Sequence, residues 1–550
     1  MSRLLKLVHT VRYLKVKQVA YRIYYRVRKP KALSTAIPEL RNVLTGWSAP
    51  SYMAAATCDG KTFTFLGHSH LFHGDWNSSD LPKLWLYNLH YFDDLNSIDA
   101  DERFELCQAL VDDWIEANPF MNGNGWEPYC LSLRVVNWVK WLSRLTPEQI
   151  KPEWIDSLAI QVDALDQQVE YHILANHLFA NAKALVFAGA FFGGKTGDYW
   201  LQKGAKLLDQ EVSEQFLNDG GHFELSPMYH SILLWDLGDL INLQQSVELP
   251  VLGQRIAEWT ERFTIGMKWF QSMVHPDQDL SFFNDATLGI APTLSNLKVY
   301  ADHLGIEVPK LEIAPSIRGN LLQDTGYGII DWPQSHRLIA DIAKVGPDYQ
   351  PGHAHADTLS CELSLFGQRV LVNSGISQYG EDAERHRQRS TAKHNTIEVD
   401  GENSSEVWAG FRVARRAKPF NVDLIQDEMS ASLKASHDGY RRLGGNVIHH
   451  RHWFADPNSL TITDKLIGRF SRAVAYWHLH PDIKLKQTDD SKFEVTLTKG
   501  EVIQLEFTGA DVEACESVWH PGFGLSVPNT KLVLRLSEQQ LATKISWSLD

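Results

Sequence analysis

Two histidines and an aspartate alternate in the stretch GHAHADTLSC, as His353, His355 and Asp357. Side chains two residues apart point to the same face of a β-strand, and an alternating apolar run follows these three. We therefore expect them to converge where a strand begins, on a metal ion, on a substrate or on one another. Histidine and carboxylate groups bind zinc and also transfer protons, so the spacing alone leaves these uses open.

A second polar group lies in the apolar stretch YHILANHLFANAKAL, which contains Asn176, His177 and Asn181. The spacing predicts a helix, on which His177 and Asn181 share a face. Polar side chains in such a helix are either satisfied inside the protein or directed into a cleft. Both interpretations remain open.

The stretch NDGGHFELSPMYHSILLW combines a glycine pair with several polar side chains. The glycines predict the end of a helix or a tight turn, and Ser226 followed by Pro227 predicts the start of the next helix. Tyr229 would then lie in the first turn, at the mouth of that helix. A tyrosine there either packs or takes part in catalysis.

A basic stretch, RHRQRSTAKHNTIEVDG, carries Arg385, Arg389 and Lys393 just before His394. It is either a solvated loop or a clamp for a carboxylate or sulfate, because arginine binds such groups through two parallel hydrogen bonds. His394 is also a candidate metal ligand together with His353, His355 and Asp357. The chain contains no HExxH motif, nucleophile elbow or glycine-rich phosphate loop, and an acid pair for glycoside hydrolysis remains open.

Two kinds of periodicity must position these side chains. From about residue 101 to 308, apolar residues recur at three- and four-residue steps, which predicts helical hairpins. After about residue 320 the pattern changes to short alternating runs separated by turns, which predicts antiparallel strands. We predict an α+β protein with a basic segment over 1–40, an incomplete α/α toroid over 41–315 and an antiparallel β-sandwich over 316–550.

Composition narrows the function classes. A formal net charge of -14 argues against nucleic-acid binding, although a local basic cleft could still accept an anionic substrate. Five widely spaced cysteines do not predict a disulfide scaffold. The 18 tryptophans predict an extensive aromatic core, with some rings left to stack on sugars.

The first 38 residues carry ten Lys or Arg and no acid. Apolar residues recur between them, so the segment predicts a basic amphipathic helix, either on an anionic membrane surface or packed on the protein. No apolar run has the length of a signal peptide or a membrane span. We expect a cytoplasmic protein that can associate with a membrane surface.

Several motifs, in this order and spacing, resemble the heparinase II/III-like polysaccharide lyases. They are NGNGWEPYCLSLRVVNWVKWL, ANHLFANAKAL, GGHFELSPMYH, GYGII, GHAHADTLSCELSLFGQRVLVNSG and KHNTIEVDG. The resemblance implies a toroid followed by a sandwich, and cleavage of an anionic, uronic-acid-containing polysaccharide by β-elimination. A link to bacterial exopolysaccharide or capsule metabolism is expected. A glycoside hydrolase or a non-catalytic glycan-binding protein on the same scaffold is the alternative.

The resemblance also implies roles for individual residues. Asn176 would neutralise the uronate carboxylate, Tyr229 would act as base, acid or both, and His353 would be a second base. His394 would belong to the strand that closes the site, and positive neighbours would lower the pKa of Tyr229. The expected substrate-binding residues are His177, Trp126, Glu224, Arg385 and Arg389.

A metal site is implied by the same comparison. Relatives use a histidine of the HxH pair, an aspartate in a DSG sequence and a later histidine, and the matching residues here are His355, Asn373 and His394. A neutral amide is a poorer zinc ligand than a carboxylate. We therefore expect no required cofactor, and a weak or structural zinc or calcium site.

Overall fold

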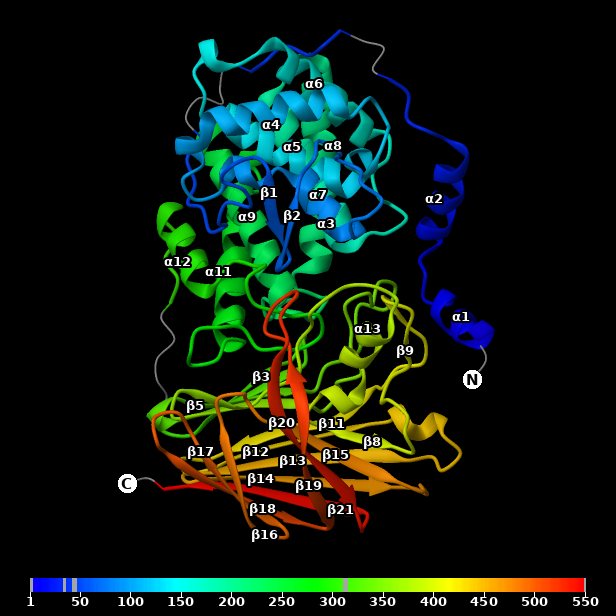
Figure 1. Cartoon of the computed structure of the whole chain (residues 1–550), viewed down its shortest axis with the longest axis vertical. Coiled ribbons are helices and arrows are strands. Elements are labelled where there is room, and N and C mark those ends of the chain that lie inside the picture. Colours follow the sequence, from blue (N-terminus) through cyan, green and yellow to red (C-terminus); the bar gives the residue numbers. More distant parts are fainter. Residues whose placement is uncertain (1–2, 33–35, 42–46, 310–314, 549–550) are drawn as a thin grey trace.

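The protein is described by a computed structural model over residues 3–32, 36–41, 47–309 and 315–548. A helical part lies above a part made of β-sheets, and two further helices lie along one side (Figure 1). The α-helices are α1 (Arg3–Val11), α2 (Val16–Val27), α3 (Lys83–Tyr91), α4 (Phe104–Ala117), α5 (Pro128–Leu142), α6 (Pro152–Asp166), α7 (Ala175–Phe191), α8 (Gly194–Gln215), α9 (Pro227–Val247), α10 (Pro250–Gly253), α11 (Ile256–Ser272), α12 (Leu294–His303) and α13 (Ala383–Gln388).

Helix α7 forms the centre of the helical part. Every residue in it except His177 is buried, and it packs against α5 and α8. A helix that is apolar on all sides is stable only when neighbours cover it completely. Its start and that of α9 therefore have fixed positions in the core, and both starts carry residues of the predicted site.

The β-part consists of three antiparallel sheets in the orders β3-β4-β5-β6-β7, β19-β20-β15-β8 and β11-β12-β13-β14-β21-β18-β17-β16, with the small pair β10-β9. The small pair β1-β2 lies with the helical part (Figure 1). The strands are β1 (Thr62–Phe65), β2 (His68–Leu71), β3 (Arg318–Leu322), β4 (Tyr327–Trp332), β5 (His336–Asp341), β6 (Cys361–Leu365), β7 (Gln368–Leu371), β8 (Ile397–Val399), β9 (Val407–Trp408), β10 (Arg412–Val413), β11 (Pro419–Gln426), β12 (Ala431–His437), β13 (Ile448–Asp456), β14 (Ser459–Ile467), β15 (Ala473–His478), β16 (Lys484–Asp489), β17 (Lys492–Thr496), β18 (Val502–Thr508), β19 (Ala510–Trp519), β20 (Val527–Leu536) and β21 (Gln540–Trp547).

Alternation along the strands builds the sandwich. In β18, buried Ile503, Leu505 and Phe507 alternate with exposed residues, as expected for a strand with one face on the core. These side chains join one apolar core with residues of the other two large sheets. The predicted fold class, a helical toroid followed by an antiparallel sandwich, is confirmed.

Helices α1 and α2 join the two parts along one side. Tyr25 donates a hydrogen bond to the carbonyl of Val169 in the helical part (2.6 Å). Trp408 in the β-part donates one to Thr10 of α1 (3.1 Å). None of the helices in the described ranges is long and apolar enough to cross a membrane.

Candidate active site

Tyr229 lies in the first turn of α9, as the sequence predicted. Ser226 caps the helix by accepting a hydrogen bond from the Tyr229 backbone N–H (3.2 Å), and Pro227 occupies the first position. The Tyr229 hydroxyl is 3.0 Å from the hydroxyl of Tyr379, and its ring stacks on His353 with centroids 3.9 Å apart. Tyr229 comes from the helical part and its two partners from the β-part, so the group forms where the two parts meet.

The expected lowering of the Tyr229 pKa is wrong. Burial raises its pKa, and the hydroxyl of Tyr379 and the charge of Asp285 raise it further. The arginines that were expected to lower this pKa bind other groups. Arg385 binds Asp285, and Arg389 binds backbone carbonyls. Tyr229 is therefore a neutral phenol at neutral pH, which suits a proton donor better than a base.

His353 lies in a loop, because β6 begins only at Cys361. The alternation that predicted a strand through His353 and His355 is therefore wrong locally, but both rings still converge on one group. His353 Nδ1 is 2.9 Å from Asp285 Oδ2, and His355 Nε2 is 2.9 Å from Asp285 Oδ1. With Nδ1–H donating to the carboxylate, the His353 Nε2 lone pair remains available as a base.

Asp285 organises the site, and the sequence analysis missed it. Its buried carboxylate accepts hydrogen bonds from both histidines and from the guanidinium of Arg385, one of them at 2.7 Å. Burial alone would raise the pKa of Asp285, but Arg385 and the two histidines hold it well below the usual value. A lone aspartate in a non-periodic loop between α11 and α12 gives no sequence signal of this role.

Asn176 and His177 occupy the first turn of α7. Leu174 and Ala175 just before them have φ values of 70° and 54°, a strained backbone that is typical of functional sites. Asn176 is buried, whereas His177 is partly exposed with its Nδ1 3.0 Å from Glu170 Oε1. Burial lowers the pKa of His177, but the Glu170 carboxylate outweighs it, and the net pKa is raised. His177 can therefore present a positive charge near neutral pH.

Glu224 connects the two groups but does not face solvent. It is 1% exposed, and its Oε2 lies 3.7 Å from His353 Nε2. Burial raises its pKa, while His353, the Asn176 backbone N–H and His177 lower it. Its burial does not support the expected direct contact with substrate, and neither carboxylate oxygen has a hydrogen-bond partner among the described residues.

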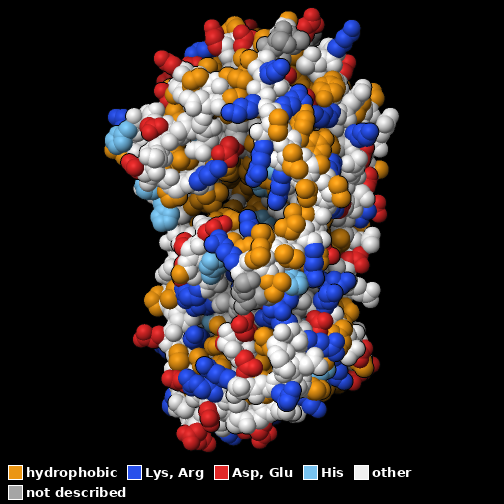
Figure 2. Space-filling view, turned by 90° about the vertical axis from the view of Figure 1, so that its right-hand side faces the viewer, with side chains coloured by type: hydrophobic (Ala, Val, Ile, Leu, Met, Phe, Trp, Pro, Cys, Tyr) orange, Lys and Arg blue, Asp and Glu red, His pale blue; other side chains and the backbone are white. Residues whose placement is uncertain are grey.

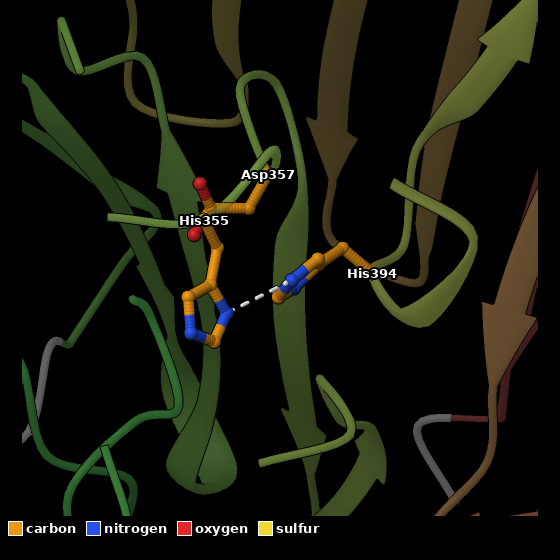
Figure 3. Close-up of side chains that lie close together, drawn as sticks. All are labelled: His355, Asp357 and His394. Carbon is orange, nitrogen blue, oxygen red and sulfur yellow. Dashed lines mark hydrogen bonds between the residues drawn. The ribbon is translucent and has the colours of Figure 1, made fainter. Parts of the chain in front are cut away.

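His355, Asp357 and His394 form a buried group (Figure 3). One potential ligand atom from each lies within 4.8 Å of the others, and His355 Nδ1 is 3.2 Å from His394 Nε2. Because His355 Nε2–H donates to Asp285, His394 Nε2–H donates to His355, and His394 Nδ1 is left without a partner in the described structure. Two imidazoles and a carboxylate fit zinc.

The side chain of Asn373, the third residue of the predicted ligand set, makes two hydrogen bonds. Its amide N–H donates to the Phe282 carbonyl (3.0 Å), and its amide oxygen accepts from the Asn395 backbone N–H (3.3 Å). Asp357, which the sequence analysis also named as a metal candidate, belongs to the buried group. His394 is 1% exposed.

Three of the expected substrate-binding residues are buried, and their polar groups bind other groups of the protein. The Trp126 indole donates to the Asn118 carbonyl (3.2 Å) and packs on Trp114, and all 18 tryptophans are buried. Arg385 binds Asp285, and Arg389 donates to backbone carbonyls, including that of Ala354 at 2.8 Å. Arg385 and Arg389 of the basic stretch therefore bind protein groups and are not free to clamp an anion.

A cavity of about 790 Å³ opens beside Tyr229 and Tyr379. Aromatic side chains from the helical part line it, among them Trp47, Tyr52 and Tyr129. Such a cavity can hold flat sugar rings against aromatic faces. Tyr229 thus lines a space large enough for a glycan, and His353 stacks on Tyr229 without being one of the lining residues.

This fold and site define a polysaccharide lyase, and the comparisons with known proteins agree. The description "Heparinase II/III N-terminus" matches residues 89–304, and "Heparinase II/III-like, C-terminal" matches residues 314–548. Together they cover most of the chain, which belongs to the heparinase II/III family.

Individual relatives are distant in sequence. A heparin-sulfate lyase of Bacteroides stercoris is 21% identical over 490 residues, which is 79% of this chain and 70% of that protein. One of Bacteroides thetaiotaomicron is 24% identical over 350 residues, covering 56% of this chain and 49% of that protein. The crystal structure of heparinase III superposes with a TM-score of 0.70 at 17% identity, over 96% of this chain and 89% of that one.

Proposed function

We propose that this lyase cleaves a uronic-acid-containing, anionic polysaccharide by β-elimination. The proton on carbon 5 of a uronate is weakly acidic, because its removal pushes charge onto an ionised carboxylate. A lyase must therefore neutralise the carboxylate, remove the proton and protonate the leaving oxygen. The observation that carries the proposal is the stacked pair of Tyr229 and His353, with His353 oriented by Asp285.

Each step has a candidate side chain. Asn176 and the cationic form of His177 would neutralise the carboxylate. His353 Nε2 would accept the carbon 5 proton, because Asp285 holds its Nδ1–H. Tyr229 would donate its proton to the leaving oxygen, since its raised pKa keeps the phenol protonated.

A hydrolase would need two available carboxylates flanking the bond. Here Asp285 is bound by Arg385 and two histidines, and Glu224 is buried. The two carboxylates next to the Tyr229–His353 pair are therefore not free to act as a hydrolytic acid and base, which favours elimination at this pair.

The direct test is a panel of uronate polymers, including bacterial exopolysaccharides and capsule polymers, incubated with the full chain. Elimination leaves a double bond at each new end, which absorbs in the ultraviolet. We expect the absorbance to rise with at least one polymer. If the polymer is shortened without this absorbance, the reaction is hydrolysis and the lyase proposal is wrong.

His355, Asp357 and His394 would hold a divalent metal such as zinc, if one binds. Their donor set fits, and His355 donates its other ring N–H to Asp285, as metal-bound histidines do. A bound ion would supply rigidity to the loop that carries His353. We propose that proton transfer itself belongs to Tyr229 and His353.

We also propose that α1 and α2 attach the enzyme to an anionic membrane surface, which favours a role near exopolysaccharide or capsule synthesis. Val16, Ile23 and Val27 along α2 are 85%, 62% and 83% exposed, and no residue of α1 is buried. Lys and Arg side chains stand among hydrophobic ones on this face (Figure 2). Exposed apolar residues flanked by cations are typical of helices that lie in a membrane interface.

Co-sedimentation with vesicles tests this attachment. We expect binding to anionic vesicles that weakens with salt, since each cation near the surface contributes about 1 kcal/mol. Replacing Val16, Ile23 and Val27 by Ser should weaken binding without changing the charge. Unchanged binding would contradict the proposal.

A further inference from the structure

We propose that the cavity beside Tyr229 selects polysaccharides without sulfate esters, whose sugars next to the cleaved uronate are neutral or cationic. This inference rests on the proposed lyase function. It concerns a different part of the site, namely the walls of the cavity and not the groups that move protons.

Among the described residues, the cavity wall carries twice as many acids as bases. Its acidic side chains are Asp93, Asp99, Asp101, Glu102, Asp236 and Asp239, and its basic ones are Lys140, Arg144 and Lys183. The wall is therefore net negative, which is unusual for a space expected to receive a polyanion.

The three cations are all engaged. Lys140 and Lys183 both bind Asp239, and Lys183 also binds Asp236. Arg144 lies 3.4 Å from Asp101. Of the cavity-wall residues that the structure describes, these pairs leave no cationic side chain available for a sulfate group.

The remaining acids lack such partners. Asp93, Asp99 and Glu102 form no ion pair among the described residues, and the only side-chain donor to Asp93 is the Asn137 amide (2.7 Å). Burial raises the pKa of Asp93 to about 6, so it is mostly ionised at neutral pH. Carboxylates next to aromatic rings accept hydrogen bonds from sugar hydroxyls or from an ammonium group. A sulfate placed there would meet like charges at short range without a counter-ion.

The test compares unsulfated and sulfated forms of one uronate polymer by ultraviolet initial rates with the full chain. We expect kcat/KM to be higher for the unsulfated form by about tenfold or more, and the gap to narrow as salt screens the repulsion. Equal rates, or faster cleavage of the sulfated form, would overturn the inference. If no uronate polymer gives unsaturated ends, the proposed function itself fails.

Binding keeps the inference testable in that case. Matched unsulfated and sulfated oligosaccharides would be titrated into the Tyr229→Phe protein by calorimetry, and no preference for the unsulfated one would reject the inference. Glu102→Lys should narrow the preference by about threefold. Glu105→Lys is the control, because Glu105 is exposed, lies three residues away and does not line the cavity. If both variants narrow the preference for the unsulfated form equally, the preference arises from the net charge of the protein, and the inference is rejected.

Discussion

His353 and His355 are two residues apart and bind the two oxygens of one carboxylate, yet they lie in different environments. His353 stacks on Tyr229, which lines the cavity, and its side chain is 15% exposed. His355 is 1% exposed and faces the buried His394. Proton transfer to a substrate requires access, so the first pair is suited to chemistry and the second to holding the loop in place. Asp285 couples the two.

Tyr229→Phe should produce the largest effect and separates the two regions most clearly. The ring and its stacking remain, but the proton donor is lost, so kcat should fall by roughly 100-fold or more. Stability should change by no more than about 0.5–1.5 kcal/mol, the value of one hydrogen bond. Ultraviolet rates and urea unfolding measure the two quantities.

Tyr379→Phe is the matched control, because it removes the same 3.0 Å hydrogen bond from the other side. We expect kcat of the Tyr379→Phe protein to fall by less than about tenfold. A Tyr229→Phe protein with near-full activity, or one no worse than Tyr379→Phe, would remove Tyr229 from the mechanism.

Asp285→Asn should damage both regions. Activity should fall by roughly tenfold or more because His353 loses the group that fixes its tautomer. Unfolding free energy should drop by about 3–5 kcal/mol because Arg385 becomes a buried charge without its partner. His353→Ala should reduce activity but should lose much less unfolding free energy than Asp285→Asn. If both variants lose the same unfolding free energy, the ion pair between Arg385 and Asp285 contributes little to stability.

Asp285→Asn should also change how the stability of the protein depends on pH. The folded-state pKa of Asp285 is depressed, so its contribution to stability is complete above its unfolded pKa of about 4 and is lost as pH falls through the lower folded value. The wild-type protein should therefore lose this stability below about pH 4, whereas Asp285→Asn should lack that component. Urea midpoints between neutral and acidic pH measure the difference.

Glu170→Gln should shift the alkaline limb of the pH–rate profile. Glu170 raises the pKa of His177, so removing its charge should make His177 lose its proton at lower pH. We expect the alkaline fall of kcat/KM to begin at lower pH than in the wild-type protein, with a loss of about threefold to tenfold near pH 7. An unshifted profile would mean that the charge of His177 does not serve the substrate carboxylate.

Chelation should have the smallest effect on activity. If metal binds His355, Asp357 and His394, its removal should lower the melting temperature while rates stay within about twofold. Asn373→Asp should not raise metal content, because its amide N–H binds a backbone carbonyl. Activity abolished by chelator and restored by zinc would show that the buried group takes part in the chemistry.

Patterns that repeat along the chain predicted the fold. The apolar run of α7 and the alternation in β18 each involve several residues, so chance matches are rare. The cap at Ser226 was predictable for the same reason, because serine and proline act locally.

The site was predictable only where a motif marked it. Tyr229, Asn176 and His353 lie in quoted motifs, but Asp285 and Tyr379 are single residues in irregular loops. The sequence also could not show that Arg385 is neutralised by Asp285, a residue 100 positions away. Such long-range pairing turned an apparent anion clamp into a structural contact.

The proton-transfer group straddles the boundary between the helical part and the β-part, with Tyr229 and Asp285 on one side and His353 and Tyr379 on the other. A displacement of one part relative to the other by an ångström or two would break the stack and the phenol pair. Heating should therefore inactivate the enzyme at a lower temperature than the one at which it unfolds. A glycan that contacts both parts should hold them in place and delay the inactivation.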